Sequence, residues 1–301
     1  MATRRAWLVA LLSAWAALLA NLEASAYCST TTCDPNSDGE DACVQVGACL
    51  TGGLPLFWKP RCITYSVHEE GSPRLGISYD AANNLIGNAL RKWTAVDCGG
   101  DTHPSIEVFT TPPVSCTCIE YNEDAGNANL WIFRDQGWPY DDDGLTLALT
   151  TITFNVETGE IYDADVEVNS GENDISIGGE RASSDFASIA THEAGHVLGL
   201  SHSSDPRATM FASYQEGTTT LRTLSEDDAA GACATHPPDR ITEPCPDTPQ
   251  PRKGFSSKCG PDEEACVCTA PGSGRASARW SVALVFASLF LAWIRRRRPK
   301  R

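Results

Sequence analysis

The sequence has little positive charge outside its two ends. Residues 27–274 carry 13 Lys and Arg against 38 Asp and Glu, a net charge of −25, whereas residues 1–26 and 275–301 carry +1 and +8. A protein that follows the phosphates of a nucleic acid needs a basic face. The acidic body therefore excludes nucleic acid as the expected partner.

Long apolar runs are missing from the body of the chain, and no internal repeat of solenoid length is visible. The apolar run at residues 6–22 follows Arg4 and Arg5 and precedes the small residues 24–26. This order is typical of a secretory signal. We expect residues 1–26 to be a signal peptide that is cleaved before Tyr27.

Cysteine, by contrast, is plentiful. All 13 cysteines follow the proposed cleavage point, which fits an exported protein in an oxidising space. Four of them, at positions 28, 33, 43 and 49, lie in the polar residues 27–56, which we interpret as a disulfide-stapled N-terminal segment. The odd total leaves at least one thiol unpaired, modified, removed with the tail or bonded to another chain.

Residues 57–238 alternate between strand and helix patterns and predict an α+β domain. Runs rich in β-branched and aromatic residues predict strands, at Cys62–Val67, Ile106–Phe109, Leu130–Phe133, Leu147–Phe154 and Ile161–Val168. Helical spacing of apolar residues and a capping serine predict helices at about Asp80–Thr94, Ser184–Leu198 and Glu226–Ala234.

The C-terminal region divides into a linker and a tail. Residues 239–274 combine prolines with four cysteines and predict a stiff linker. In residues 275–301, fifteen uncharged and mostly apolar residues precede an arginine cluster. As a helix they would span about 22 Å, short of the roughly 30 Å hydrocarbon layer. A membrane anchor stays an alternative, but we favour a sorting signal that is cut between about Cys266 and Trp280.

The strongest motif runs from His192 to His202. His192 and His196 lie four residues apart, so that both imidazoles share one face of a helix. Gly199 lets the helix stop, and His202 then returns as a third ligand. Three neutral imidazoles leave one zinc position open for water. Glu193 lies one step round the helix, where it can take a proton from that water as the general base.

The pattern His-Glu-x-x-His-x-x-Gly-x-x-His resembles the motif of the metzincin zinc peptidases. Ser203, Asp205-Pro206 and Met210 narrow the resemblance to the matrixin branch, and residues 159–169 are similar to a strand of bacterial matrixin-like proteins. The resemblance implies one catalytic zinc and a methionine turn at Met210 beneath the imidazoles. It also implies a twisted, mostly parallel five-stranded sheet, two long helices and a small C-terminal helical subdomain.

The resemblance further implies a zinc-dependent endopeptidase acting on proteins or peptides. Because the tail is similar to processed sorting signals of Gram-negative bacteria, including the myxobacterial type, we expect a secreted or cell-surface protein. Membrane contact is expected only through residues 275–301 before processing, and the oligomeric state stays open. Two alternatives remain: a catalytically inactive surface adhesion module, against which the intact Glu193 counts, and a zinc hydrolase of non-peptide amides.

Three further features leave alternatives open. Pro60-Arg61-Cys62 resembles the core of a latency switch, although a structural disulfide, with Cys98 as a candidate partner, is favoured. Acidic runs at residues 34–39 and 141–144 are candidate calcium ligands, with solvated turns favoured. Tyr214 is a candidate wall of the substrate pocket, although the family's proline after the methionine is missing. A second, structural zinc is not expected, since the other histidines, His68, His103 and His236, are scattered.

Overall fold

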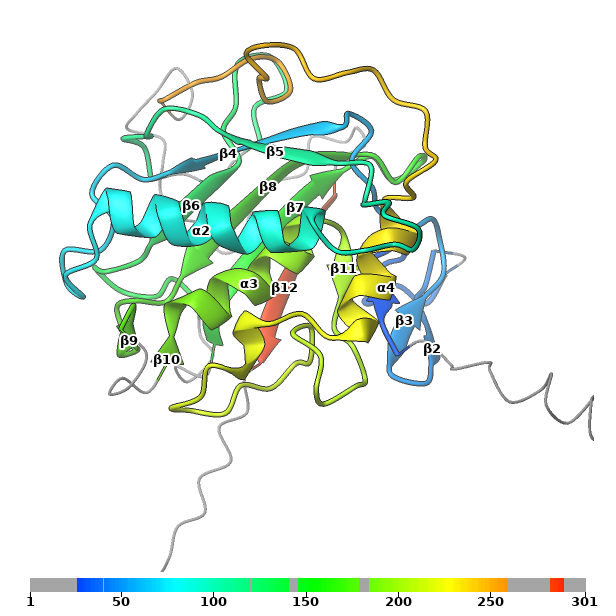
Figure 1. The fold of residues 1–301 in the computed structure, drawn as a ribbon, viewed down its shortest axis with the longest axis horizontal. Helices are drawn as coiled ribbons and strands as arrows, with labels where there is room; N and C mark the ends of the chain where they lie inside the picture. The colour runs from blue at the N-terminus through cyan, green and yellow to red at the C-terminus, as the bar shows by residue number, and fades with distance from the viewer. Residues whose placement is uncertain are drawn as a thin grey trace, which may run out of the picture.

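One mixed sheet carries both long helices on the same face (Figure 1). The computed structural model describes residues 26–39, 41–117, 119, 121–140, 146–178 and 184–258, and the backbone of 282–289. The five central strands are β4 (Cys62–Val67), β5 (Glu107–Thr110), β6 (Leu130–Phe133), β7 (Thr146–Phe154) and β8 (Ile161–Val168). Their order is β7-β8-β6-β4-β5, parallel except for β7 against β8. The mostly parallel five-stranded sheet predicted from the sequence is present.

The helices begin where side chains cap them. In α2 (Tyr79–Thr94), the Ser78 side chain accepts from the Ala81 amide. In α3 (Phe186–Val197), the Asp185 side chain accepts from the Ser188 amide. In α4 (Glu226–Thr235), Ser225 and Asp228 form a capping box. A short 3-10 turn, η1 (Thr220–Arg222), precedes α4. Each predicted helix is confirmed within about two residues at either end.

Short strand pairs flank the main sheet. Strand β1 (Cys28–Ser29) pairs with β11 (Leu200–Ser201), and β9 (Ile175–Ser176) pairs with β10 (Ser184–Asp185). The hairpin of β2 (Val44–Val46) and β3 (Cys49–Thr51) lies within the N-terminal segment. Because Ser184 and Asp185 form β10, helix α3 begins two residues later than the sequence pattern suggests.

The inward face of the sheet is apolar. Alternate residues such as Trp131 and Phe133 on β6, and Val166 and Val168 on β8, are buried against the two long helices. Helix α2 contributes Ile86 and Trp93 to this core, and α3 contributes Phe186, Ile189 and Val197. Helix α3 therefore packs against both the sheet and α2.

The opposite face of the sheet buries acidic groups. Asp163, Asp165 and Glu167 alternate along β8 and are each at most 2% exposed. Glu167 pairs with Arg134, which also donates to the carbonyl of Thr117 in the loop before β6. Asp165 accepts a 2.7 Å hydrogen bond from the Leu130 amide at the start of β6. These carboxylates thus bind polar groups, such as the first amide of β6, that the neighbouring strands leave without a partner.

Asp163 and Asp165 are neighbouring buried acids on one face of β8, and the pKa of each is raised. Their carboxyl groups are hydrogen-bonded to each other, and Asp163 Oδ1 has no partner among the described residues. Burial raises the pKa of Asp163 to about 7. Burial, followed by the charge of Asp163, raises the pKa of Asp165 well above its usual value. Two carboxylates this close cannot both ionise cheaply in a dry environment.

Disulfides tie both flanking segments to the domain. Cys28–Cys49 and Cys33–Cys43 staple the N-terminal segment as the sequence predicts. The predicted pairing of Cys62 with Cys98 is wrong: Cys62 bonds to Cys245, and Cys98 bonds to Cys233. Their sequence separations are 183 and 135 residues, and spacing alone cannot identify such distant partners. The first residues of the predicted linker are therefore fastened to the start of β4.

Part of the apolar tail forms a strand. The backbone of β12 (Val282–Leu289) pairs antiparallel with β7, which adds a sixth strand beside the central five. Residues 282–289 are therefore extended rather than helical, because the open edge of β7 offers backbone partners to an apolar segment. Across the part of the chain that the structure describes, no helix has the length and apolar character needed to cross a membrane. The anchor and the sorting signal stay predictions.

The Cys62–Cys245 disulfide predicts that neither thiol reacts in the native protein. Alkylation without reductant should leave both unlabelled, and peptide mapping by mass spectrometry should recover them in one linked peptide. Cys62→Ser and the matched Cys245→Ser should each lower the free energy of unfolding by about 2–5 kcal/mol. A labelled Cys62, together with higher peptidase activity in Cys62→Ser alone, would instead identify a latency switch.

The Asp163–Asp165 pair predicts a stability loss with rising pH. In the folded protein Asp163 holds its proton up to about pH 7, whereas in the unfolded chain Asp163 releases it near the ordinary pKa of 3.8. The stabilisation is complete below pH 3.8 and is lost as the pH rises through 7. Asp163→Asn, which cannot titrate, should flatten this decline, whose slope is on the order of 1.4 kcal/mol for each tenfold fall in proton concentration. Thermal melts of both proteins between pH 5 and 8 measure it; parallel curves would contradict a raised pKa of Asp163.

Candidate metal centre

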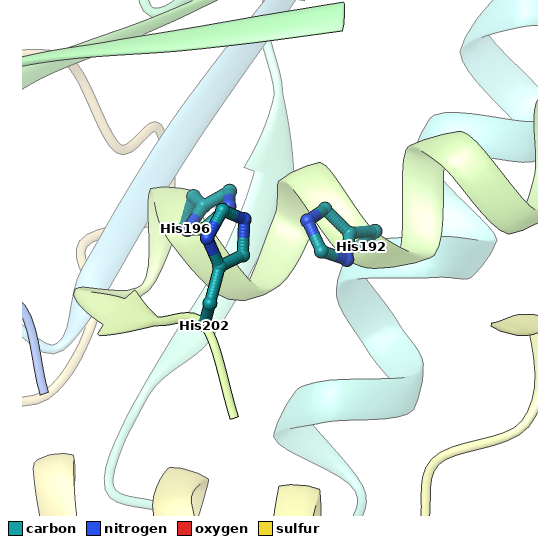
Figure 2. A group of neighbouring side chains, drawn as sticks. All are labelled: His192, His196 and His202. Atoms are coloured by element: carbon teal, nitrogen blue, oxygen red, sulfur yellow. The ribbon is translucent and has the colours of Figure 1, made fainter. Parts of the chain in front are cut away.

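Helix α3 places two imidazoles on one buried face. His192 and His196 are one turn apart, both fully buried, and their ring centroids lie 4.9 Å apart (Figure 2). Apart from Glu193, the surrounding residues of α3 are apolar or small, and every residue from Ser188 to Val197 is buried. The predicted pair of histidines is therefore directed into the interior of the domain rather than into solvent.

A reversal of the chain brings His202 to the other two. Gly199 has φ +95°, and a Cβ there would lie 2.8 Å from the Leu56 carbonyl oxygen, so a glycine is required. Strand β11 follows, held by β1 of the N-terminal segment. Figure 2 shows His202 rising from the chain after β11 toward His196, with ring centroids 4.9 Å apart. The ligand atoms of the three histidines all lie within 4.8 Å of one another.

Backbone carbonyls orient two of the rings. His192 Nδ1 lies 2.6 Å from the Thr209 carbonyl oxygen, and His196 Nδ1 lies 2.8 Å from the Leu200 carbonyl oxygen. A carbonyl can only accept, so each Nδ1 carries the proton and each Nε2 is the ligand atom. Burial lowers the pKa of His192 to about 4, and burial and the charge of His192 lower the pKa of His202 to about 3. Burial lowers the pKa of His196 as well, so all three rings are neutral at pH 7.

Met210 packs beneath the centre. A Cβ on Gly195, which lies between the two helical histidines, would be 2.2 Å from Met210 Sδ. The turn that carries Met210 is fixed by Asp228 of α4, which accepts from the amides of Thr209 and Met210 at 2.7 and 3.0 Å. Because the Thr209 carbonyl also accepts from His192, this buried carboxylate holds both the floor and one imidazole in place.

The residues after His202 are linked to the N-terminal segment. Ser203 Oγ donates to Asp227 Oδ2 at 2.6 Å, and the backbone amides of Ala26 and Tyr27 donate to Asp227 Oδ1 at 2.7 and 2.9 Å. Ser203 also donates its amide to the Met210 carbonyl. The loop with the third histidine is thus tied to α4, to the methionine turn and to the chain near residue 27.

Distant donors close the C-terminal end of α3. Its last carbonyls would lack partners within the helix. Trp58 Nε1 donates to the Val197 carbonyl at 2.7 Å, His236 Nε2 to Leu198 at 2.9 Å and the Thr30 amide to Gly199 at 2.9 Å. The sequence pattern assigns none of these donors a role, because they lie far from α3 along the chain and form no local motif with it.

Glu193 lies beside the histidines and contacts the sheet. Its side chain is fully buried, and its Oε2 accepts a 2.6 Å hydrogen bond from Thr150 Oγ1 on β7. Glu193 belongs to the same helix as His192 and His196, as the motif requires. Thr150 was missed from the sequence, where it is one of several threonines in a predicted strand.

Tyr214, the predicted pocket residue, reaches the start of α3. It is 5% exposed, and its hydroxyl accepts from the Asp185 amide at 3.0 Å and donates to the Thr218 carbonyl at 2.6 Å. Arg222 pairs with the Asp185 carboxylate through two nitrogens. The loop after the methionine is therefore fastened to the N-terminus of the helix that carries the histidines.

The predicted calcium ligands form no comparable cluster among the described residues. Asp34 Oδ1 accepts from the Asn36 amide within an exposed turn, and residues 141–144 lie outside the described part of the chain. In the ranges that the structure describes, the three histidines are the one group of His, Cys, Asp and Glu spaced to hold a metal ion. Calcium binding stays a prediction.

The contact between Gly195 and Met210 predicts that Gly195→Ala destabilises the protein. Alanine is the better helix former by about 1 kcal/mol, but its Cβ would displace Met210 and meet Trp93 at 2.8 Å. We expect a net loss of roughly 1–3 kcal/mol in the free energy of unfolding, with weaker zinc binding. Gly231→Ala in α4, whose Cβ meets nothing closer than 3.1 Å, is the control. Denaturation of both variants tests this, and an unchanged Gly195→Ala would contradict the packing.

Comparison with known proteins agrees with this geometry. Residues 57–236 match the family model of the matrixins, peptidase M10. The chain is 30% identical to matrix metalloproteinase-C of Caenorhabditis elegans over 56% of its own length and 26% of the relative. It is 30% identical to matrilysin of Mus musculus over 58% and 57% of the two lengths. It is 30% identical to metalloendoproteinase 1 of Glycine max over 56% and 48%.

The matched region covers more than half of the chain, and it contains the three histidines, Glu193 and Met210. The chain itself spans between about a quarter and somewhat over half of the length of these relatives. The resemblance drawn from the motif is confirmed at the level of the family. On the site geometry and the match together, this chain belongs to the matrixin family.

Proposed function

We propose that this protein is an exported, zinc-dependent endopeptidase that hydrolyses peptide bonds of proteins. The observation that carries the proposal is the cluster of the buried His192 and His196 with the partly buried His202, beside the Glu193 carboxylate in a matrixin domain. Membership of the family supports protein or peptide substrates. No described feature supports the alternative of an inactive adhesion module.

The donor set fits zinc. Three neutral imidazoles form a common protein ligand set of catalytic zinc and leave one position for water or substrate. Here the lowered pKa values of His192 and His202 mean that no proton has to be removed before a metal ion binds. The carbonyls of Thr209 and Leu200 hold the rings of His192 and His196 in the tautomer that binds through Nε2. His192, His196 and His202 would hold the ion.

Each remaining residue then has a limited chemical role. A zinc ion in this site would polarise the scissile carbonyl and acidify a water molecule. Glu193 would take the proton from that water at a carboxylate oxygen and pass it to the leaving amine. Met210 and Gly195 would keep the floor of the site apolar and dry, since both are buried against α2.

Export is the proposal that accounts for the ends of the chain. Four disulfides among the described residues require an oxidising compartment to form. We propose that residues 1–26 direct export and that a second cleavage between about residues 266 and 280 releases the catalytic domain to the outer surface or medium. Both cleavage regions lie mainly outside the described residues. Intact-mass measurement of the released protein tests both ends.

The roles of Glu193 and His196 predict different losses on substitution. Glu193→Ala should bind about one zinc per chain and lose peptidase activity by roughly a hundredfold or more, because it removes the base and no ligand. His196→Ala should lose zinc as well as activity. His103→Ala, at an exposed histidine outside the cluster, is the control and should resemble the wild type. Metal analysis and digestion of a peptide library measure the two properties.

The same digestion, repeated with a zinc chelator, distinguishes the function classes. Cleavage that stops with the chelator and returns with zinc supports an endopeptidase. A zinc-loaded wild-type protein that leaves every library peptide intact would contradict it, and assays on non-peptide amides would then test a different hydrolase.

A further inference from the structure

Thr150 is a polar residue on the inward face of β7. The residues of this strand that face the helices are Ala148, Thr150, Ile152 and Phe154, opposite Val168, Val166, Ala164 and Ile161 of β8. Ala148, Ile152 and Phe154 belong to the hydrophobic core and are at most 1% exposed. Thr150 is also fully buried, so its hydroxyl lies in an otherwise apolar row.

The Thr150 hydroxyl needs a partner, and Glu193 supplies it. Burying a hydroxyl without a hydrogen bond costs about 1–3 kcal/mol in proteins. Valine has nearly the same shape and a strong strand preference, and it would fill this position without that cost. Thr150 Oγ1 instead lies 2.6 Å from Glu193 Oε2. Because an ionised carboxylate only accepts, the hydroxyl donates.

This hydrogen bond restrains the direction of the carboxylate. A glutamate side chain has three rotatable bonds, whereas Thr150 is β-branched and is held within a strand paired to β8. The donor is therefore the rigid partner. It fixes Oε2 toward the sheet and sets the plane of the carboxyl group relative to His192 and His196 on the same helix.

We propose that Thr150 is a positioning residue that holds the Glu193 carboxylate in its working orientation. The inference rests on the proposed function, in which Glu193 accepts and delivers a proton. With Oε2 held by Thr150, the carboxyl group keeps one orientation for the proton transfer. Thr150 itself exchanges no proton with substrate and acts only through Glu193.

The test compares Thr150→Val with Thr151→Val in the full-length protein. Thr151 is the neighbouring residue, is 8% exposed, and points to the opposite face of the sheet, toward Asp165. Thr150→Val should lower kcat on a cleaved library peptide about ten- to a hundredfold, the size expected for losing a hydrogen bond to a charged group. KM and zinc content should stay unchanged, Thr151→Val should keep full kcat, and Thr150→Ser should restore most of it.

Two further measurements separate positioning from a general packing role. In the Glu193→Ala background, Thr150→Val should cause no additional loss of residual activity, because its effect passes through Glu193. A crystal structure of metal-free Thr150→Val should show the Glu193 carboxylate rotated or in more than one rotamer, with the three histidines unmoved. This structural result does not depend on activity.

The outcomes distinguish this inference from the proposed function. If Glu193→Ala is inactive while Thr150→Val keeps full kcat and an unmoved Glu193, the endopeptidase stands and the positioning role is overturned. Equal losses in Thr150→Val and Thr151→Val would assign Thr150 to packing alone and would also overturn it. If the wild type cleaves nothing, the proposed function fails, and the orientation of Glu193 in the variant still decides whether Thr150 positions it.

Discussion

Burial of the neutral imidazoles of His192 and His196, with His202 partly buried beside them, is the constraint on which the rest of the structure depends. A dry interior favours the uncharged ring, and so prepares the nitrogens for a metal ion, but it also demands a partner for each remaining polar atom. The Nδ1 atoms of His192 and His196 find theirs in the carbonyls of Thr209 and Leu200. The Thr209 carbonyl belongs to the methionine turn and the Leu200 carbonyl to β11. The geometry of the centre is therefore only as well defined as these two segments outside α3 are.

The segments around the centre are held in place largely by carboxylates. Asp228 receives the amides of the methionine turn, Asp227 receives Ser203 and the chain near residue 27, and Asp185 receives the first turn of α3 and Arg222. On the far face of the sheet, Asp165 receives the first amide of β6. The acidic excess of the body is thus partly structural, since buried or half-buried carboxylates satisfy backbone groups that regular elements leave open.

The flanking segments are integral to the centre. The N-terminal segment supplies β1 beside β11, the Thr30 amide at the end of α3 and two disulfides. The segment after residue 238 returns to β4 through the Cys62–Cys245 disulfide, and Arg240 donates to the Trp58 carbonyl. Both segments reach the same end of α3. The predicted stapled segment, domain and linker differ in composition. In the described residues, however, parts of all three pack together in one structure.

The sequence by itself determined the main strands and helices and the position of the histidine cluster. Periodicity located the strands and helices, because burial on one face repeats with the geometry of each element. The spacing of His192 and His196 located the centre, because residues four apart share a helix face. Tertiary structure alone decided the partners: which cysteines bond, which carbonyls orient the rings, and that Thr150 meets Glu193. These contacts join residues far apart in the chain, and local propensity and spacing carry no information about which distant groups the packed sheet and helices bring within hydrogen-bond distance.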